Sequence, residues 1–293
     1  MSLPTYRIIP KVDIKNSNVV KGFQMEGLRA LGDPLNFCKA YYEDGADEII
    51  INDLTASMIG RSNLFDIIKH ITSIIFIPIT IGGGVRTIED ISNLLKIGAD
   101  KVFINTQAIL NPDFITKAVK IFGSSTITVS IETLRKDDGN FYCFYNNGRE
   151  QTNIELKYWI NETQKLGCGE ILLSSINYDG SNKGYDSSLL DYIDTNLINV
   201  PLIFNSGFND YKSIVDVIEK YNEISGFCIS SKLHYEFIEN NLNDVSINEG
   251  GNTDFIKKLI NKSKYKNKNQ KYSAISNLKK ELYKNNYQNF RLL

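Results

Sequence analysis

The stretch Ile77–Ile91, IPITIGGGVRTIEDI, contains a strand, a turn and the start of a helix. Its first part, IPITIG, is a nearly continuous apolar run, which is typical of a parallel strand buried on both faces. Three glycines follow it. The next run, IEDISNLLKIG, is amphipathic and ends at a glycine, as helices often do. The stretch therefore predicts one complete strand-to-helix unit.

Seven further apolar runs of this kind are spread along the chain, and amphipathic stretches separate most of them. They are YRIIPKVDI (6–14), DEIIIND (47–53), KVFIN (101–105), TITVSIE (126–132), GEILLSS (169–175), PLIFN (201–205) and GFCISS (226–231). Strands that alternate with helices in this way predict an α/β protein, a (β/α)8 TIM barrel, in a single domain over residues 1–293. A doubly wound open sheet is the alternative, but no GxGxxG turn follows the first strand.

The two halves of the chain resemble each other. VPLIFNSGFNDYKSI (200–214) repeats the opening stretch, and GCGEILLSSINYDGS (167–181) repeats GADEIIINDLTAS (45–57). Related positions keep a nearly constant spacing: Asp13 and Glu132 lie 119 residues apart, Glu48 and Glu170 122, and Pro78 and Pro201 123. Duplication of a half-barrel of four units would leave this pattern.

The composition argues against several classes of protein. The 293 residues are 42% hydrophobic and 23% charged, with a formal net charge of −1, so we expect no nucleic-acid or membrane partner. No apolar run has the length of a membrane span and the N-terminus lacks a signal-peptide layout, so we expect the cytoplasm. The four cysteines are widely spaced, which favours reduced, partly buried thiols over disulfides or zinc ligands. A Lys/Asn-rich insertion near residues 262–272 is expected to be a solvated loop followed by a short helix.

Two acids stand at corresponding strand ends. Asp13 ends the first predicted strand and Glu132 the fifth, so in a barrel both would face the mouth formed by the carboxyl ends of the strands. Opposed carboxylates can divide proton transfer between them if their environments separate their pKa values. The alternative is that each acid only holds a neighbouring loop.

Small and polar residues follow four other strands. Glycines at a strand-to-helix turn let backbone N–H groups approach an oxyanion, and nearby hydroxyl and amide groups add donors. The first group of such residues is Gly82, Gly83, Gly84, Asn105 and Thr106, and the related group in the second half is Ser206, Gly207, Ser230 and Ser231. The two groups predict a ligand with a phosphate at each end, with a plain tight turn as the alternative at the second.

Two further sets of charges are notable. Lys21 lies at the start of KGFQMEGLRALGDP (21–34), a long glycine-containing segment that suits a mobile lid over a charged substrate, although it could equally be an ordinary loop lysine. At the opposite end of the barrel, at or near the starts of strands, stand Arg7, Glu48, Lys101 and Glu170. Two cations and two anions there can pair across the axis as a structural plug or as a gate on an axial tunnel.

Ordered motifs from nearly the whole chain resemble the cyclase subunit of imidazole glycerol phosphate synthase. They are RIIPKVDIKNSNVVKG (7–22), EGLRALGDP (26–34), DLTAS (53–57), TIGGGVRTIED (80–90), GADKVFINTQAILNP (98–112), FGSS (122–125), GEILLSSINYDGSNKGYD (169–186) and NFRLL (289–293). The resemblance implies a barrel paired with a glutaminase subunit whose ammonia passes through the barrel. At the far mouth, ammonia reacts with a bisphosphorylated aminoimidazole-carboxamide ribonucleotide and gives imidazole glycerol phosphate and an aminoimidazole-carboxamide ribotide. No metal or organic cofactor is implied.

The resemblance also implies roles for individual residues. Asp13 and Glu132 match the catalytic acids, Lys21 matches a substrate-contacting lysine, and Asp100 matches an acid at the glutaminase docking surface. The four charges at the strand starts match an ammonia gate. The implied substrate-binding residues are Lys21, Asp53, Gly82, Gly83, Gly84, Asn105, Thr106, Ser174, Asp179, Gly180, Ser206, Gly207, Ser230 and Ser231.

Departures from the family pattern concentrate at the substrate mouth. Lys11 replaces a small or thiol residue, Glu132 replaces Asp, Asn177 replaces an acid, and NSGF (205–208) replaces a Ser-Gly-Gly turn. The sequence around Asp13 and Glu132 looks closer to that of paralogues that accompany sugar amidotransferases in surface-polysaccharide pathways. An ammonia-conducting partner of such an amidotransferase is therefore an alternative to the cyclase, and a non-catalytic barrel that binds a phosphate ligand is a third possibility.

Overall fold

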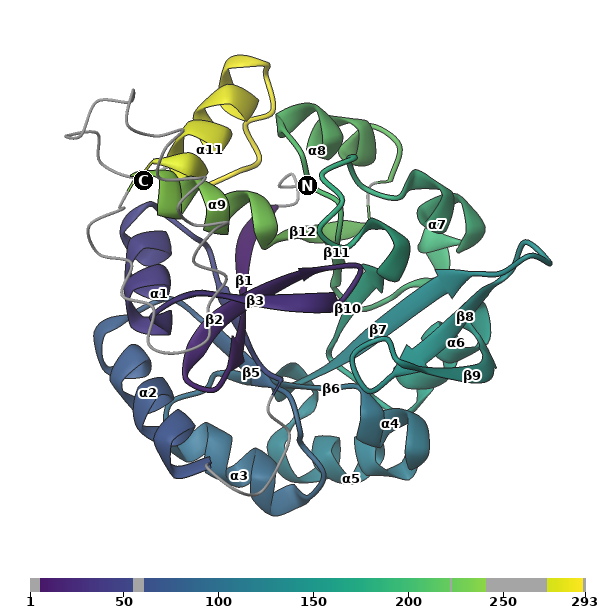
Figure 1. The fold of residues 1–293 in the computed structure, drawn as a ribbon. Helices are drawn as coiled ribbons and strands as arrows, with labels where there is room; N and C mark the ends of the chain where they lie inside the picture. The colour runs from purple at the N-terminus through teal and green to yellow at the C-terminus, as the bar shows by residue number, and fades with distance from the viewer. Residues whose placement is uncertain (1–5, 55–60, 222, 241–272, 292–293) are drawn as a thin grey trace.

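Eight parallel strands close into a barrel in the computed structural model, which describes residues 6–54, 61–221, 223–240 and 273–291 (Figure 1). The strands are β1 (Arg7–Lys15), β4 (Ile49–Asp53), β5 (Ile79–Gly82), β6 (Lys101–Ile104), β7 (Ile127–Arg135), β10 (Glu170–Ser175), β11 (Leu202–Asn205) and β12 (Ile224–Ile229). Each pairs in parallel with its neighbours, and the β7–β10 and β12–β1 pairings leave no free edge in the ring. The predicted TIM barrel is confirmed, and the open sheet is excluded by this closure.

The helices form the outer layer of the barrel (Figure 1). They are α1 (Pro34–Glu43), α2 (Arg61–Ile74), α3 (Ile88–Lys96), α4 (Thr106–Leu110), α5 (Asp113–Phe122), α6 (Leu156–Lys165), α7 (Ser187–Tyr192), α8 (Tyr211–Ile218), α9 (Ser231–Asn240) and α11 (Ala274–Lys284), with short 3-10 turns η1 (Ser124–Thr126), η2 (Ile176–Tyr178) and η3 (Thr195–Leu197). Within the described part of the chain, no helix combines the length and the apolar character needed to cross a membrane.

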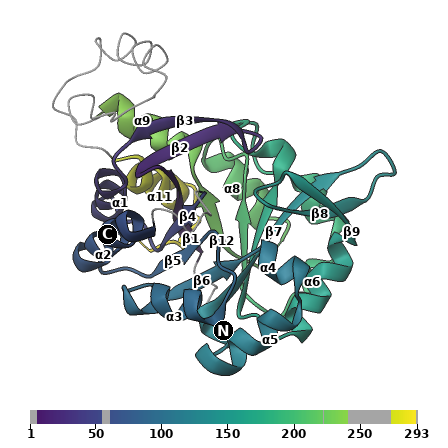
Figure 2. The ribbon, with the colours of Figure 1, turned by 60° about the horizontal axis from the view of Figure 1, so that its bottom comes forward.

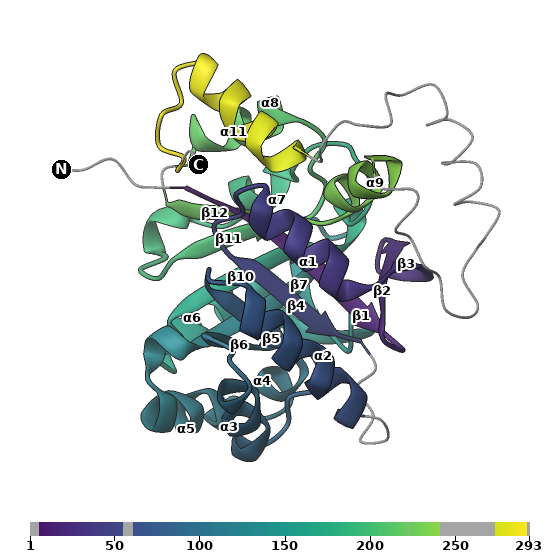
Figure 3. The ribbon, with the colours of Figure 1, turned by 90° about the vertical axis from the view of Figure 1, so that its left-hand side faces the viewer.

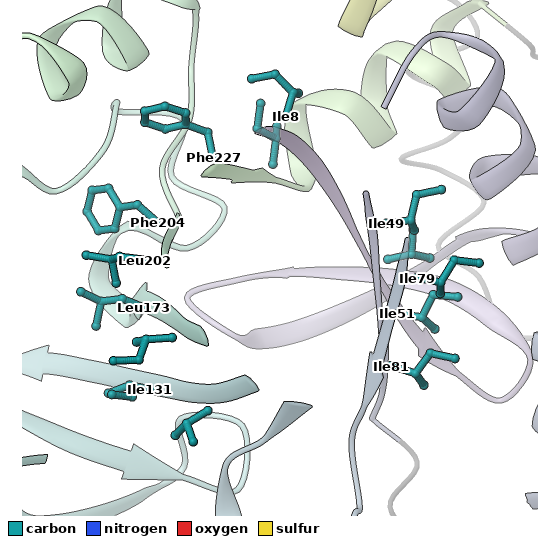
Figure 4. Packing of buried hydrophobic residues seen from close by; sticks show 14 of the residues in the cluster. Ile8, Ile49, Ile51, Ile79, Ile81, Ile131, Leu173, Leu202, Phe204 and Phe227 are labelled. Atoms are coloured by element: carbon teal, nitrogen blue, oxygen red, sulfur yellow. The ribbon is translucent and has the colours of Figure 1, made fainter. Parts of the chain in front are cut away.

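Side chains on the two faces of the strands form two separate apolar clusters. One face of each strand packs against the helices, and the labelled residues in Figure 4, among them Ile8, Ile51 and Phe204, belong to this large outer cluster. The other face points to the barrel axis, where a second cluster forms a belt. This apolar belt consists of Ile9, Ile50, Phe103, Leu172, Ile203 and Cys228. The separation follows from the two-residue period of a strand.

Each half of the barrel carries an antiparallel hairpin directly after its first strand. The first is β2 (Asn18–Phe23) with β3 (Glu26–Gly32), and the second is β8 (Phe141–Tyr145) with β9 (Glu150–Glu155). The β2–β3 hairpin lies over the carboxyl ends of the barrel strands (Figures 2 and 3). The segment 21–34, predicted as a loop, is therefore largely an ordered hairpin, because its backbone groups pair between β2 and β3.

A buried ion pair fastens the last helix to the barrel. The ammonium group of Lys279 on α11 lies 2.7 Å from Asp47 and donates to the carbonyl of Gly45 at 2.8 Å. Asp47 also accepts the backbone N–H of Ile8, and Asp44 accepts the N–H of Ile275 at the start of α11. Helix α11 is the helix expected after the basic insertion. The insertion itself, near 262–272, lies outside the described residues.

Substitution of Lys279 by Met should strongly destabilise the protein. Lys279 is 2% exposed, so its removal leaves the buried carboxylate of Asp47 without its cation, which typically costs about 3–5 kcal/mol. Lys284→Met on the same helix is the matched control, because its pair with Glu281 is exposed and is worth less than about 1 kcal/mol. Urea unfolding measures both. Equal stabilities of the two variants would contradict a structural role for the Lys279–Asp47 pair.

Candidate active site

The ends of β1 and β7 bring Asp13 and Glu132 to the same mouth of the barrel. Both line the same cavity, and both are less than one-tenth exposed. Asp13 accepts a hydrogen bond from the Asn52 amide at 2.8 Å, and the ammonium groups of Lys11 and Lys21 lie 3.3 and 3.9 Å from its oxygens. Burial alone would raise the pKa of Asp13, but the surrounding cations and amide outweigh it and hold the pKa below its ordinary value.

Glu132 has a different environment. Its carboxylate accepts the backbone N–H of Gly148 at 2.8 Å, from the turn between β8 and β9. Burial is the largest influence on this group, and it raises the pKa from an ordinary 4.5 to about 7 despite the opposing effects of Lys11 and of the Gly148 N–H. The two acids therefore differ in protonation near neutral pH, with Asp13 ionised and Glu132 partly protonated.

A second cavity extends from this centre toward the first glycine turn. Gly83, Gly84, Asn105 and Thr106 line it together with Asp53 and Glu132. Gly83 has φ +95°, and a Cβ there would lie 2.0 Å from the carbonyl oxygen of Asp53, so only glycine fits. Gly82 ends β5 and its backbone lies against the Phe103 ring.

Asn105 and Thr106 are already engaged with the protein. The Asn105 amide donates to the carbonyls of Ser130 and Phe144, at 3.0 and 3.3 Å. The Thr106 hydroxyl accepts the backbone N–H of Asn146 at 3.1 Å. These bonds tie the end of β6 to the β8–β9 hairpin, so the two side chains shape the cavity as well as lining it.

A third cavity lies on the side of the second half-barrel. Ser206, Gly207, Ser230 and Ser231 all line it, with Gly180. The Ser206 hydroxyl is buried and has no hydrogen-bond partner among the described residues. A buried hydroxyl without a partner is costly, so one beside a cavity points to a ligand that would complete it. The predicted second group of polar residues therefore surrounds one cavity.

Lys21 and Asp179 connect the β2–β3 hairpin to the mouth. The Lys21 ammonium donates to both carboxylate oxygens of Asp179, at 2.8 and 2.9 Å, and both residues are buried. Asp179 also accepts the backbone N–H of Met25 at the hairpin tip. Gly180 lets the hairpin approach, because a Cβ there would lie 2.7 Å from the carbonyl oxygen of Gly22. Lys21 is thus held in the mouth, with Asp13 as its second anionic neighbour.

The predicted residues of the opposite end form a closed ring of ion pairs. Arg7 lies 2.8 Å from Glu48 and 2.7 Å from Glu170, and Lys101 lies 2.8 Å from each of the same two carboxylates. Burial raises and the two cations lower the pKa of Glu170, with a net decrease, so this acid stays ionised. Asp100, at the same end, is exposed, and one of its oxygens accepts the backbone N–H of Ile79. We call the four paired residues Arg7, Glu48, Lys101 and Glu170 the charged ring.

Two residues that contact the acids were not predicted from the sequence. Asn52 holds Asp13, and the Gly148 N–H holds Glu132. Asn52 could have been found, because it lies two and four residues after the inward-facing Ile50 and Glu48. Ser174, predicted as a ligand residue, accepts a hydrogen bond from Asn205 at 2.9 Å. No comparable signal marks Gly148, whose contact depends on how the hairpin folds back.

Known proteins match this chain over most of its length. The family described as "Histidine biosynthesis protein" matches residues 7–239. The imidazole glycerol phosphate synthase subunit HisF of Legionella pneumophila is 43% identical over 201 residues, covering 69% of this chain and 94% of that protein. The subunit of the same name from Exiguobacterium sp. is 40% identical over 228 residues, covering 78% and 88%. That of Streptococcus mutans is 38% identical over 229 residues, covering 78% and 90%.

The raised pKa of Glu132 predicts how stability depends on pH. The unfolded chain releases this proton near 4.5, whereas the folded protein keeps it until about 7, so the stability that the group contributes is lost as the pH rises between these values. Relative to Glu132→Gln, the wild type should lose about 3 kcal/mol of unfolding free energy between about pH 4 and pH 8. Urea unfolding of both proteins across this range is the measurement. Parallel stability curves would show that the pKa of Glu132 is not raised.

Proposed function

Since this chain belongs to the histidine biosynthesis protein family, we propose that it is the cyclase subunit of an imidazole glycerol phosphate synthase. Its substrate is a bisphosphorylated aminoimidazole-carboxamide ribonucleotide, which reacts with ammonia at the barrel mouth. The products are imidazole glycerol phosphate and an aminoimidazole-carboxamide ribotide. The relatives carry the name of this synthase, and the mouth holds the acid–base groups that such a reaction needs.

The observation that carries the proposal is the difference between the two carboxyl groups. Addition of ammonia and closure of a ring require protons to be removed from nitrogen and delivered to departing atoms. Asp13, held ionised by cations, is suited to accept a proton, and Glu132, with a pKa of about 7, is suited to donate one. Both line the same cavity, so one bound substrate can reach them.

The flanking cavities fit the two phosphates of such a substrate. Gly83 and Gly84 border one cavity, and Ser206 and Gly207 border the other. Lys11 and Lys21 lie in the cavity between them. Backbone N–H groups at glycine turns and unpaired hydroxyl groups are suitable partners for phosphate oxygens.

A route for ammonia from the opposite end is the second part of the proposal. The charged ring closes the amino end of the barrel, and the apolar belt fills the interior between the ring and the mouth. An apolar interior favours neutral ammonia over ammonium, because burying an unpaired charge is costly. We place the source of ammonia, a glutaminase partner, over the charged ring.

Exposed apolar side chains around the charged ring support docking there. Phe76, before β5, is 81% exposed, and Ile121, at the end of α5, is 59% exposed. Both belong to segments that lead into the amino ends of the strands, as does Asp100. Large exposed apolar groups with charged residues beside them are typical of protein interfaces. With all four cysteines buried and unpaired, we place the complex in the cytoplasm.

Substitution of Asp13 by Asn should abolish most ammonia-dependent turnover. The amide keeps the size of the side chain but accepts no proton at neutral pH, so kcat/KM for the ribonucleotide with ammonium salt should fall by about 100-fold or more. Asp216→Asn on the exposed face of α8 is the control and should behave as the wild type. Full activity of the Asp13 variant would exclude its catalytic role.

The same assay distinguishes the cyclase from the alternative function, that of an ammonia-conducting partner of a sugar amidotransferase. Free ammonium salt bypasses any partner, so the wild-type chain alone should turn over the ribonucleotide. The presence of Lys11 and Glu132 at the mouth is the observation that favours a reaction other than that of the cyclase. If the wild type forms no product, the role of an ammonia-conducting partner for a sugar amidotransferase would replace the cyclase.

Lys101→Met should affect coupling rather than cyclase chemistry. The variant breaks the charged ring on one side, leaving Arg7 alone between two carboxylates. With a glutaminase subunit bound, more glutamine should be hydrolysed per product formed than in the wild-type complex, while turnover with ammonium salt stays near that of the wild type. Unchanged coupling would argue that the charged ring is only a structural plug.

A further inference from the structure

Lys11 is a cation inside the barrel, between the apolar belt and the mouth. It lies on the inward face of β1, two residues after Ile9 of the belt and two before Asp13. It is 9% exposed, yet it lines both the central cavity and the cavity beside the first glycine turn. A lysine this buried normally has a close partner, since an unpaired buried charge is costly.

The partner of Lys11 is Asp13 and not Glu132. The ammonium nitrogen lies 3.3 Å from a carboxylate oxygen of Asp13. No cation lies within 4.0 Å of the Glu132 carboxylate among the residues that the structure describes. The backbone of Lys11 is fixed, because its carbonyl accepts the Ser230 hydroxyl at 3.0 Å, and Ser230 in turn contacts the buried His234 at 3.2 Å.

Other charged and titratable groups also face the two acids. They are Lys15 on β1, Lys21 on β2, Arg149 in the β8–β9 turn, Asp179 after β10, Cys228 on β12 and His234 on α9. Burial lowers the pKa of His234 to about 3, so its imidazole is neutral, and burial raises the pKa of Cys228, so its thiol is neutral. Lys11 is the nearest cation to Asp13, at 3.3 Å against 3.9 Å for Lys21.

The charge state of Lys11 excludes one role and supports another. Burial would lower its pKa, but the carboxylates of Asp13 and Asp179 outweigh burial and raise it above the ordinary value. Lys11 therefore stays protonated and acts as a fixed charge, not as a nucleophilic amine. Because Coulomb energy falls with distance, this charge acts more strongly on Asp13 than on Glu132.

We propose that Lys11 is a positioning residue that assigns the two proton-transfer roles: paired with Asp13, it keeps that carboxylate ionised as the base and leaves Glu132 as the acid. The proposal deepens the proposed function and rests on it for the reaction that the two acids perform. It gives a reason for a buried lysine on the inward face of β1. A lysine that bound only substrate phosphate would have no need to pair with Asp13.

The test compares Lys11→Met, Lys11→Arg and Lys117→Met as full-length proteins. Selective ¹³C labelling of Asp and Glu carboxyl groups, assigned with Asp13→Asn and Glu132→Gln, gives the NMR titration midpoints of both acids. In Lys11→Met the Asp13 midpoint should rise by about 1–3 pH units and by more than that of Glu132, which narrows the gap between them. Lys11→Arg should restore the gap. Lys117→Met, which removes an exposed charge on α5 away from the mouth, should leave it unchanged.

A kinetic measurement accompanies the titration. The pH profile of kcat/KM is recorded with ammonium salt at constant free ammonia, and its acidic limb should move to higher pH in Lys11→Met but not in Lys11→Arg. An unchanged Asp13 midpoint, or equal shifts of both acids, would overturn the proposal, and so would a loss expressed only as a higher KM. If the wild type shows no turnover, the proposed function fails, while the titration still decides the role of Lys11.

Discussion

The two-residue period of a β-strand, applied to a closed barrel, constrains every inward-facing side chain of this protein. On β1 the inward positions are Arg7, Ile9, Lys11 and Asp13, which pass from the charged ring through the apolar belt to the mouth. The other long strands repeat the order, as in Glu170, Leu172 and Ser174 on β10. Charges can stand at both ends because each end offers partners, whereas the middle offers none. The same alternation therefore separates two polar layers that have different chemistry.

The hairpins give the mouth its asymmetry. The two halves of the barrel each place an acid at the end of their first strand and a hairpin after it, but the hairpins contact the acids differently. The β2–β3 hairpin contributes Lys21, whose ammonium group lies near Asp13, while the β8–β9 hairpin contributes the hydrogen bond from the Gly148 N–H to Glu132. A symmetric frame thus holds two acids whose pKa values move in opposite directions. Acid–base catalysis needs this difference.

The strands and the charged ring could be predicted because their signals are local or follow one period. Continuous apolar runs marked all eight strands, and charges at the strand starts marked the ring. The β2–β3 hairpin was predicted as a loop because Gly22, Gly27 and Gly32 are typical of loops, and its stability depends on contacts with Asp179 far along the chain. Similarly, the hydrogen bonds from the Asn105 amide to carbonyls of β7 and β8 could not be predicted, because they join segments far apart in the chain. Contacts between distant segments leave no trace in the spacing of residues.

The length of Glu132 acquires a physical meaning from this arrangement. A longer acid at a catalytic position would ordinarily be less well placed, and displacement by about an ångström can cost on the order of 100-fold in rate. Here the longer side chain reaches a hydrogen-bond donor, because the Glu132 carboxylate accepts the Gly148 N–H at 2.8 Å. The donor lies in a turn in which Asn146, Asn147 and Gly148 all have positive φ. That turn is itself tied to the start of α4 through Thr106. The longer side chain is therefore held at its carboxylate as well as through β7, and it stays in the mouth where Asp13 also lies.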